Sequence, residues 1–258
     1  MPIFTPEDHE KFKALKITKV AAALELLLAD AANEQVLPET LFLRAVDDAL
    51  ESRRSARIER LVAQAGLPFA DASIAELDYR EDRGGLNAVQ MGRYAKNDWG
   101  REQMNVVITG MSGTGKTHLA CAIAVAACHN EHSVKYWRMD NLGLALVSVH
   151  DDHIAHRNLL EQLKEVDLLI LDDFLTVGID ARATNDLFTV LADRDRRLPT
   201  MVLSQTGPEY WVQMIHDRVA ADSIVNRLAN NSRHIKLGTV DMRREENMRK
   251  RQAGDHWN

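Results

Sequence analysis

The sequence predicts an α/β fold in which five parallel strands are wrapped by helices and preceded by a small all-helical N-terminal domain. Two observations support this prediction. From Asn105 onward, short apolar stretches rich in β-branched residues alternate with helical stretches, which is typical of a parallel sheet. Before that point, over roughly residues 11–66, apolar residues recur every three or four positions, which is the spacing of amphipathic helices.

The predicted strands are short and mostly apolar. They are residues 105–109 (NVVIT), 133–139 (SVKYWRM), 167–173 (DLLILDD), 200–206 (TMVLSQT) and 234–237 (HIKL). The residues after the last strand are strongly charged, so we expect no large C-terminal lid beyond the sheet.

A glycine-rich loop lies between the first strand and the helix that follows it. Its pattern is a glycine, four residues, then Gly115, Lys116 and Thr117, which is the complete phosphate-loop pattern in its required strand-loop-helix context. Such a loop turns backbone N–H groups toward phosphates, the lysine reaches the β- and γ-oxygens, and the hydroxyl ligates Mg²⁺. The residues expected to bind ATP are therefore Gly110, Gly113, Thr114, Gly115, Lys116, Thr117 and His118.

Two acids follow the third predicted strand. Asp172 is expected to hold Mg²⁺ beside Thr117, and Asp173 is expected to polarise the attacking water. An extra strand and helix between the two motifs favour an ATPase over a small-molecule kinase. Because related ATPases usually have Glu at the second position, the shorter Asp173 predicts slow or partner-dependent hydrolysis.

Further candidates lie on later elements. Ser204 and Gln205 end the fourth strand, from which a polar side chain reaches the γ-phosphate or the water; the alternative is an ordinary polar strand end. Arg227, on a helix before the last strand, is a candidate for reaching a neighbour's γ-phosphate; the alternative is an ion pair with Asp222.

Two clusters of ionisable side chains are each more typical of a solvent-exposed surface than of a binding site. Three histidines at residues 150, 153 and 156 lie in a polar stretch (HDDHIAH), which is more typical of an exposed surface than of a metal site. The second helix carries a basic cluster among acidic neighbours, which alone favours a solvated face. The cluster is Arg53, Arg54, Arg57 and Arg60.

Composition limits the class of protein. The 258 residues contain 32 Lys and Arg against 38 Asp and Glu, for a net charge of −6, so any nucleic-acid contact must come from a local patch. We expect Cys121 and Cys128 to be core residues. No apolar run has the length of a membrane span, and the N-terminal residues are too polar and acidic for a signal peptide. We therefore expect a soluble, cytoplasmic protein.

Together these motifs resemble the IstB-like family, the ATP-binding helpers of insertion-sequence transposition within the AAA+ ATPases, close to the DnaC helicase loaders. The resemblance rests on NVVITGMSGTGKTHLACAIAVAAC, DLLILDDF, MVLSQTGPEYWVQMI, ADSIVNRLANNSRHIKL and the N-terminal helical text, over roughly residues 11–245. It implies an AAA+ core over residues 101–240, a DNA-binding helical domain over 1–68, a linker and pocket approach over 69–100 and a charged tail over 241–258.

The resemblance also implies a function. ATP binding would assemble protomers around duplex DNA, present that DNA to a DDE-type transposase, and be reset by hydrolysis. It implies that Arg227 acts in trans, that Arg243 contacts phosphate, and that the second-helix arginines hold the DNA backbone. Gln205 departs from the family's frequent Asn. Alternatives are a DnaC-like helicase loader, a small-molecule kinase, and a nucleotide-locked scaffold with little turnover.

Overall fold

The computed structural model describes residues 3–96, 102–176, 180–215 and 218–252. The chain divides into two compact units, residues 1–60 and residues 61–258. The boundary lies within one long helix, α3 (Pro38–Ala65).

The N-terminal unit is helical, as predicted. It contains α1 (Pro6–Ala14), α2 (Thr18–Ala29), the 3₁₀ turn η1 (Ala31–Asn33) and the first part of α3. Helix α1 begins before the predicted helical region because Thr5 and Asp8 form a reciprocal capping box at its start. Its small core consists of Ala21, Leu41, Ala45 and Ala49.

The second unit is built on a five-stranded parallel sheet of order β2-β3-β4-β1-β5. This confirms the number and the direction of the predicted strands. The strands are β1 (Asn105–Thr109), β2 (Val134–Arg138), β3 (Leu168–Asp172), β4 (Thr200–Ser204) and β5 (Ser232–Lys236). Because β4 lies between β1 and β3, the glycine loop and the acids of β3 start from strands that are not neighbours.

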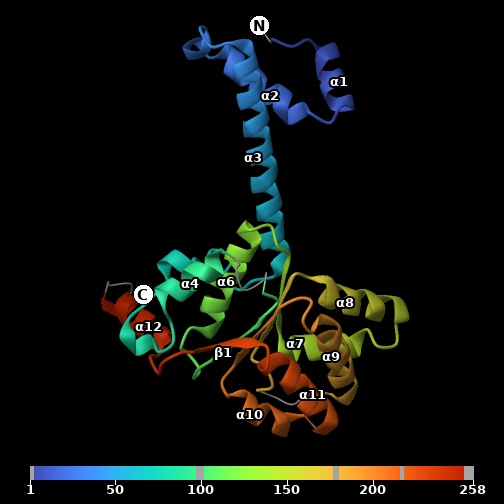
Figure 1. The fold of residues 1–258 in the computed structure, drawn as a ribbon, viewed down its shortest axis with the longest axis vertical. Helices are drawn as coiled ribbons and strands as arrows, with labels where there is room; N and C mark the ends of the chain where they lie inside the picture. The colour runs from blue at the N-terminus through green and yellow to red at the C-terminus, as the bar shows by residue number, and fades with distance from the viewer. Residues whose placement is uncertain (1–2, 97–101, 177–179, 216–217, 253–258) are drawn as a thin grey trace. The chain divides into compact units, whose positions relative to one another are not determined.

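Both faces of the sheet are covered, so the central strands β1, β3 and β4 are buried on both sides, whereas the edge strands β2 and β5 are partly exposed. Figure 1 shows α4 and α6 on one side and α8, α9 and α11 on the other, which matches two separate hydrophobic clusters. Val106 and Ile108 belong to the first cluster and Val107 to the second, as strand alternation requires. The covering helices are α4 (Ala88–Ala95), α6 (Lys116–His129), α7 (Met139–Ser148), α8 (His153–Glu165), α9 (Ala181–Arg194), α10 (Pro208–Trp211) and α11 (Arg218–Ala229).

The segment predicted as a linker packs into this unit over its described part, residues 69–96. It contains η2 (Ile74–Glu76), η3 (Glu81–Arg83) and α4, and it contributes Leu77, Met91 and Tyr94 to the first cluster. The segment also lies beside the end of β5, because the Gly85 N–H donates to the carbonyl of Lys236 at 2.7 Å. The acidic, glycine-ended composition of residues 70–85 favours a linker, and composition alone does not show which apolar side chains of the segment pack on the sheet.

The predicted charged tail is helical over its described part. Helix α12 (Met242–Gln252) is the one element described after β5, where we expected no large lid. Asp241 caps it by accepting the N–H of Arg244 at 3.1 Å. None of the helices in the described ranges has the length and apolarity to cross a membrane.

A buried arginine, Arg194, forms hydrogen bonds at the amino end of β4, on the side of the sheet away from the glycine loop. The Arg194 side chain is 1% exposed, and its guanidinium donates to the carbonyls of Leu163, Val166 and Pro199 at 2.9, 2.7 and 2.6 Å. It also donates to the Thr200 hydroxyl at 3.1 Å. The side chain thereby joins the end of α8 to the start of β4.

We expect Arg194→Met to lower the free energy of unfolding by about 3 kcal/mol, because it leaves several buried carbonyls without a donor. Arg197→Met is the matched control. Its side chain is 41% exposed and pairs with Glu165 and Asp193, so the cost should be about 1 kcal/mol or less. Urea unfolding followed by circular dichroism measures both, and equal losses would contradict the structural role of Arg194.

Candidate functional site

The glycine loop is shaped by positive backbone angles and close contacts. Gly113 and Gly115 have φ values of +83° and +87°, which other residues rarely adopt. A Cβ atom on Gly113 would lie 2.4 Å from a carboxylate oxygen of Asp241, and one on Gly110 would lie 2.8 Å from the Thr114 hydroxyl. The loop therefore requires glycine at the positions where the motif has it.

Lys116 begins α6 and turns its side chain back into the loop. Its ammonium donates to the carbonyls of Gly110 and Met111 at 2.8 and 3.0 Å, and the residue is 7% exposed. Burial lowers the pKa of Lys116, while Asp172 and Asp173 oppose that shift. A buried cation beside the N-terminus of a long helix forms a site for a polyanion such as a triphosphate.

The carboxylate of Asp172 connects three elements at the carboxyl edge of the sheet. It accepts the hydroxyls of Thr117 and Tyr136, each at 2.7 Å, and the N–H of Asp173 at 2.7 Å. Burial, and next the hydrogen bond to Asp172, raise the pKa of Tyr136 well above its usual range. The adjoining Thr117 and Asp172 oxygens are hard donors of the kind that Mg²⁺ prefers, so the residues fit this ion.

Asp173 follows in a left-handed backbone conformation, with φ of +51°. Asp and Asn are enriched in this conformation relative to longer side chains such as Glu. Its side chain lines the cavity above the loop and lies 3.5 Å from a guanidinium nitrogen of Arg138. A carboxylate is thereby held in the same cavity as the glycine loop.

The loop opens into a cavity of about 380 Å³. Several predicted residues line it together: Gly113, Gly115, Lys116, Thr117, His118, Asp173, Gln205 and Arg243. The segment before β1 supplies the opposite wall, with Phe69, Leu77 and Arg83. Phe69 also packs against the His118 ring at a centroid distance of 5.5 Å. The cavity thus combines a cationic phosphate end with an apolar surface suited to a base.

Sequence reasoning missed Arg83, which lines this cavity together with Lys116 and Arg243. The residue is 5% exposed, and desolvation lowers its pKa. Its guanidinium lies 3.2 Å from where a Cβ of Gly115 would stand, directly over the loop. Arg83 lies in an acidic stretch without a motif, and its position depends on the pairing of residues 83–85 with residues 236–238 at the end of β5. The same applies to Tyr136, whose contact with Asp172 has no local sequence signal.

Ser204 is not brought into the cavity, which corrects our expectation for this residue. It is 1% exposed, and its hydroxyl donates to the Phe174 carbonyl at 3.2 Å and accepts from the Trp211 indole at 3.1 Å. Side chains alternate along a strand, so Ser204 points to the side of α10 while the next residue, Gln205, reaches the cavity.

Arg227 lies near the amino end of β1, at the opposite end of this strand from the glycine loop. Its carbonyl accepts from the side chain of Asn105, the first residue of β1, at 2.8 Å. Its guanidinium donates to Ser223 and lies 5.1 Å from the centroid of the Phe188 ring. The side chain borders a polar hollow of about 320 Å³ with residues of α11 and the α9–β4 loop, and not the cavity of its own glycine loop.

The predicted arginine cluster lies on α3 in the N-terminal unit. All four side chains are exposed, and Arg53 donates to the carbonyl of Lys16 at 2.8 Å. Arg53, Arg57 and Arg60 have helical spacing that gives them one face, with Arg54 beside it.

Residues 10–252 match the family described as IstB-like ATP binding protein. The chain belongs to this family. The IstB-like chain is 33% identical to the putative insertion sequence ATP-binding protein y4pL of Sinorhizobium fredii, over 92% of this chain and 96% of the relative. It is 26% identical to the IS21 putative ATP-binding protein of Pseudomonas aeruginosa, over 93% and 88% of the two chains.

Solved structures show the same fold at low identity. This IstB-like protein superposes on DnaI with a TM-score of 0.55 at 20% identity, over 71% of this chain and 99% of that one. For the DnaC helicase loader, the TM-score is 0.52 at 15% identity, over 65% and 97%. These structures therefore confirm the predicted α/β fold with a five-stranded parallel sheet.

Lys116→Ala should weaken ATP binding by about 100-fold or more, because it removes the buried charge that faces the phosphates. Lys96→Ala, at the exposed C-cap of α4, is the control and should bind ATP as the parent does. Titration with a fluorescent ATP analogue measures both variants. Unchanged affinity in Lys116→Ala would remove the assignment of the nucleotide site.

Proposed function

We propose that this protein is an ATP-dependent, DNA-binding regulator of transposition. In this proposal it oligomerises on duplex target DNA and delivers that DNA to a partner DDE-type transposase, and ATP hydrolysis resets the assembly. The observation that carries the proposal is a complete nucleotide cavity in a chain whose relatives are named as insertion-sequence ATP-binding proteins.

The residues that line the cavity support a specific mode of ATP binding in this proposal. Lys116 and the loop N–H groups hold the β- and γ-phosphates, and two further cations in the cavity lining, Arg83 and Arg243, add positive charge. Thr117 and Asp172 would hold Mg²⁺, which supplies neutralisation of the phosphate charge when bound. Phe69 and Leu77 cover the base.

Asp173 orients and polarises the attacking water, because its carboxylate faces the cavity directly after the acid of β3. Gln205 is the second candidate for contact with the water or the γ-phosphate. The pairing of Asp173 with Arg138 restrains this carboxylate, which is consistent with slow turnover that a partner stimulates.

Asp173→Asn should lower the rate of ATP hydrolysis by about 100-fold or more while leaving ATP affinity unchanged. Asn tolerates the left-handed backbone of this residue, so the change removes charge with little strain. Asp140→Asn is the control, because Asp140 pairs with the same Arg138 at 3.1 Å. Phosphate release measures both, and parental hydrolysis by Asp173→Asn would assign the acid elsewhere.

Arg227 acts on the γ-phosphate of an adjacent protomer in this proposal. Two observations support a role in trans: the residue borders a surface hollow, and its backbone lies at the opposite edge of the sheet from its own glycine loop. An arginine supplied in this way stabilises transition-state charge and is worth about 10³–10⁵ in rate.

Arg227→Ala should bind ATP normally and hydrolyse it at least about 10³-fold more slowly. Mixing gives the sharper test: Lys116→Ala still offers its arginine and Arg227→Ala still binds ATP, so the two inactive variants together should regain activity on DNA. The double variant mixed with either single variant is the control and should stay inactive. Absence of rescue where the parent assembles would count against a trans role.

The second-helix arginines hold the phosphate backbone of duplex DNA in this proposal. Their exposure and their shared helical face support a contact with phosphates, and the absence of aromatic residues among them argues against base stacking. The acidic residues around them, including Glu51 and Glu59, predict modest affinity with strong salt dependence.

Glu substitution of Arg53, Arg57 and Arg60 should weaken binding to all duplexes alike. The slope of log affinity against log salt should become shallower by about 0.9 for each phosphate that the variant no longer neutralises. Arg44→Glu, on the same helix outside the cluster, is the matched control. Fluorescence anisotropy over a salt series measures both, and a weakening confined to certain sequences would indicate base readout instead.

A helicase loader is the alternative, because the chain shares its fold with the DnaC helicase loader. The two functions differ in what the N-terminal unit binds. A transposition regulator retains duplex DNA with purified protein alone, whereas a loader captures a replicative helicase. A binding assay that offers the purified chain each partner separately distinguishes them.

A further inference from the structure

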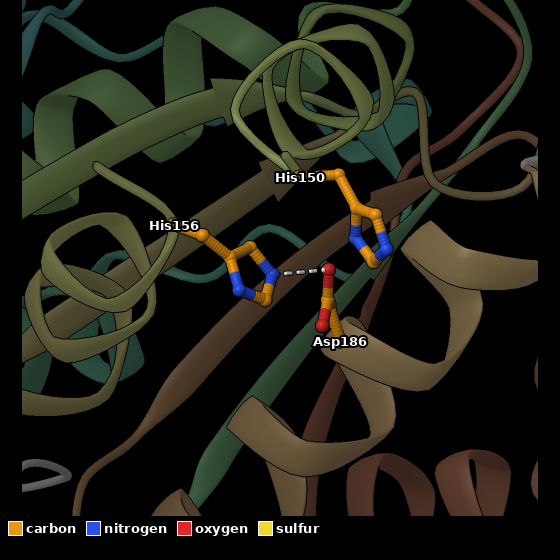
Figure 2. A group of neighbouring side chains, drawn as sticks. All are labelled: His150, His156 and Asp186. Atoms are coloured by element: carbon orange, nitrogen blue, oxygen red, sulfur yellow. Dashed lines mark hydrogen bonds and ion pairs between the residues drawn. The ribbon is translucent and has the colours of Figure 1, made fainter. Parts of the chain in front are cut away.

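Two histidines that are six positions apart meet an aspartate from another helix on the face of the sheet covered by α7, α8 and α9. They are His150, in the turn after α7, His156 in the first turns of α8, and Asp186 on α9. Figure 2 shows both imidazole rings turned toward the Asp186 carboxylate. Sequence reasoning assigned this histidine stretch to a solvated surface because it had no means of finding Asp186.

The spacing of the three groups suits a small cation. One donor atom from each side chain lies within 4.8 Å of the other two, and His156 Nε2 lies 2.8 Å from Asp186 Oδ2. Ligands at about 2.0–2.1 Å from a tetrahedral zinc ion are separated by about 3.3 Å, a value between these two limits. Coordination therefore requires side-chain adjustments and no change in the helices.

The cluster is partly enclosed and has an unsatisfied atom. The His156 and Asp186 side chains are 20% and 15% exposed. Nδ1 of His150 is buried and has no hydrogen-bond partner among the described residues. A buried polar atom of this kind is costly in a native fold, and a metal ion is one of the partners that satisfies it. The two rings also pack edge-on at 5.5 Å, which holds His150 over the pair.

We propose that His150, His156 and Asp186 form a binding site for a divalent transition-metal cation of the zinc type. Two imidazoles and one carboxylate are the donor set of such ions, whereas Mg²⁺ prefers oxygen ligands throughout. The site is therefore distinct in chemistry from the nucleotide site. The bound ion joins the α7–α8 turn to α9, the helix that follows the segment after Asp173, and a fourth position is open to water or to a ligand from a partner.

The test uses the full chain without an affinity tag, stripped with a chelator and then titrated with Co²⁺ and Zn²⁺. We expect one equivalent of Co²⁺ to give the intense visible absorption of a four- or five-coordinate nitrogen-containing site, and Zn²⁺ to displace it. Saturating Zn²⁺ should raise Tm by about 5–10 °C, whereas excess Mg²⁺ should not displace Co²⁺.

Variants separate this site from others on the chain. His150→Gln and Asp186→Asn should each weaken Co²⁺ binding by at least about 10-fold and abolish the visible bands. Two controls should keep them: His153→Gln, which changes an exposed histidine beside the cluster, and Asp172→Asn, which changes the nucleotide site. Circular dichroism verifies that each variant is folded. Weak binding without visible bands in the parent, or parental bands in folded His150→Gln and Asp186→Asn, would overturn the proposal.

Discussion

The hydrogen bonds to the Asp172 carboxylate are the constraint on which the site depends. They join the start of α6 through Thr117, strand β2 through Tyr136, and the turn after β3 through the N–H of Asp173. Strand β4 separates β1 from β3, so this carboxylate is where the two halves of the nucleotide site make direct contact. The two apolar faces of the sheet fix the strands, and the strands in turn fix the distance between loop and acid.

The glycine loop and Arg227 lie at opposite ends of the strands, which limits how protomers can assemble. The glycine loop opens at the carboxyl edge of the sheet, while Arg227 lies beside the first residue of β1 at the other edge. A contact in which one protomer's arginine meets another's phosphates is heterologous, and repeated heterologous contacts produce rings or helical filaments. Under the proposed function, such an assembly presents many copies of the α3 arginines to one duplex.

Local patterns predicted most of the sheet and the phosphate loop, because they depend on alternation, glycine angles and helix starts that neighbouring residues determine. Contacts between segments that are distant in sequence could not be predicted, because no local pattern encodes them. Arg83 reaches the cavity because residues 83–85 pair with the end of β5, Tyr136 meets Asp172 from the neighbouring strand, and Asp186 meets the histidines from another helix. Ser204 was assigned to the cavity because strand pattern identifies a strand end and not the direction of its side chains.

Under the proposed function, ATP in this cavity drives assembly of the protein on duplex DNA. Sedimentation velocity of the full chain with duplex DNA and a non-hydrolysable ATP analogue tests this coupling. We expect a single large species that contains DNA and protein, and it should dissociate when ADP replaces the analogue. A chain that remains monomeric with analogue and DNA, at concentrations where both are bound, would show that ATP does not drive assembly.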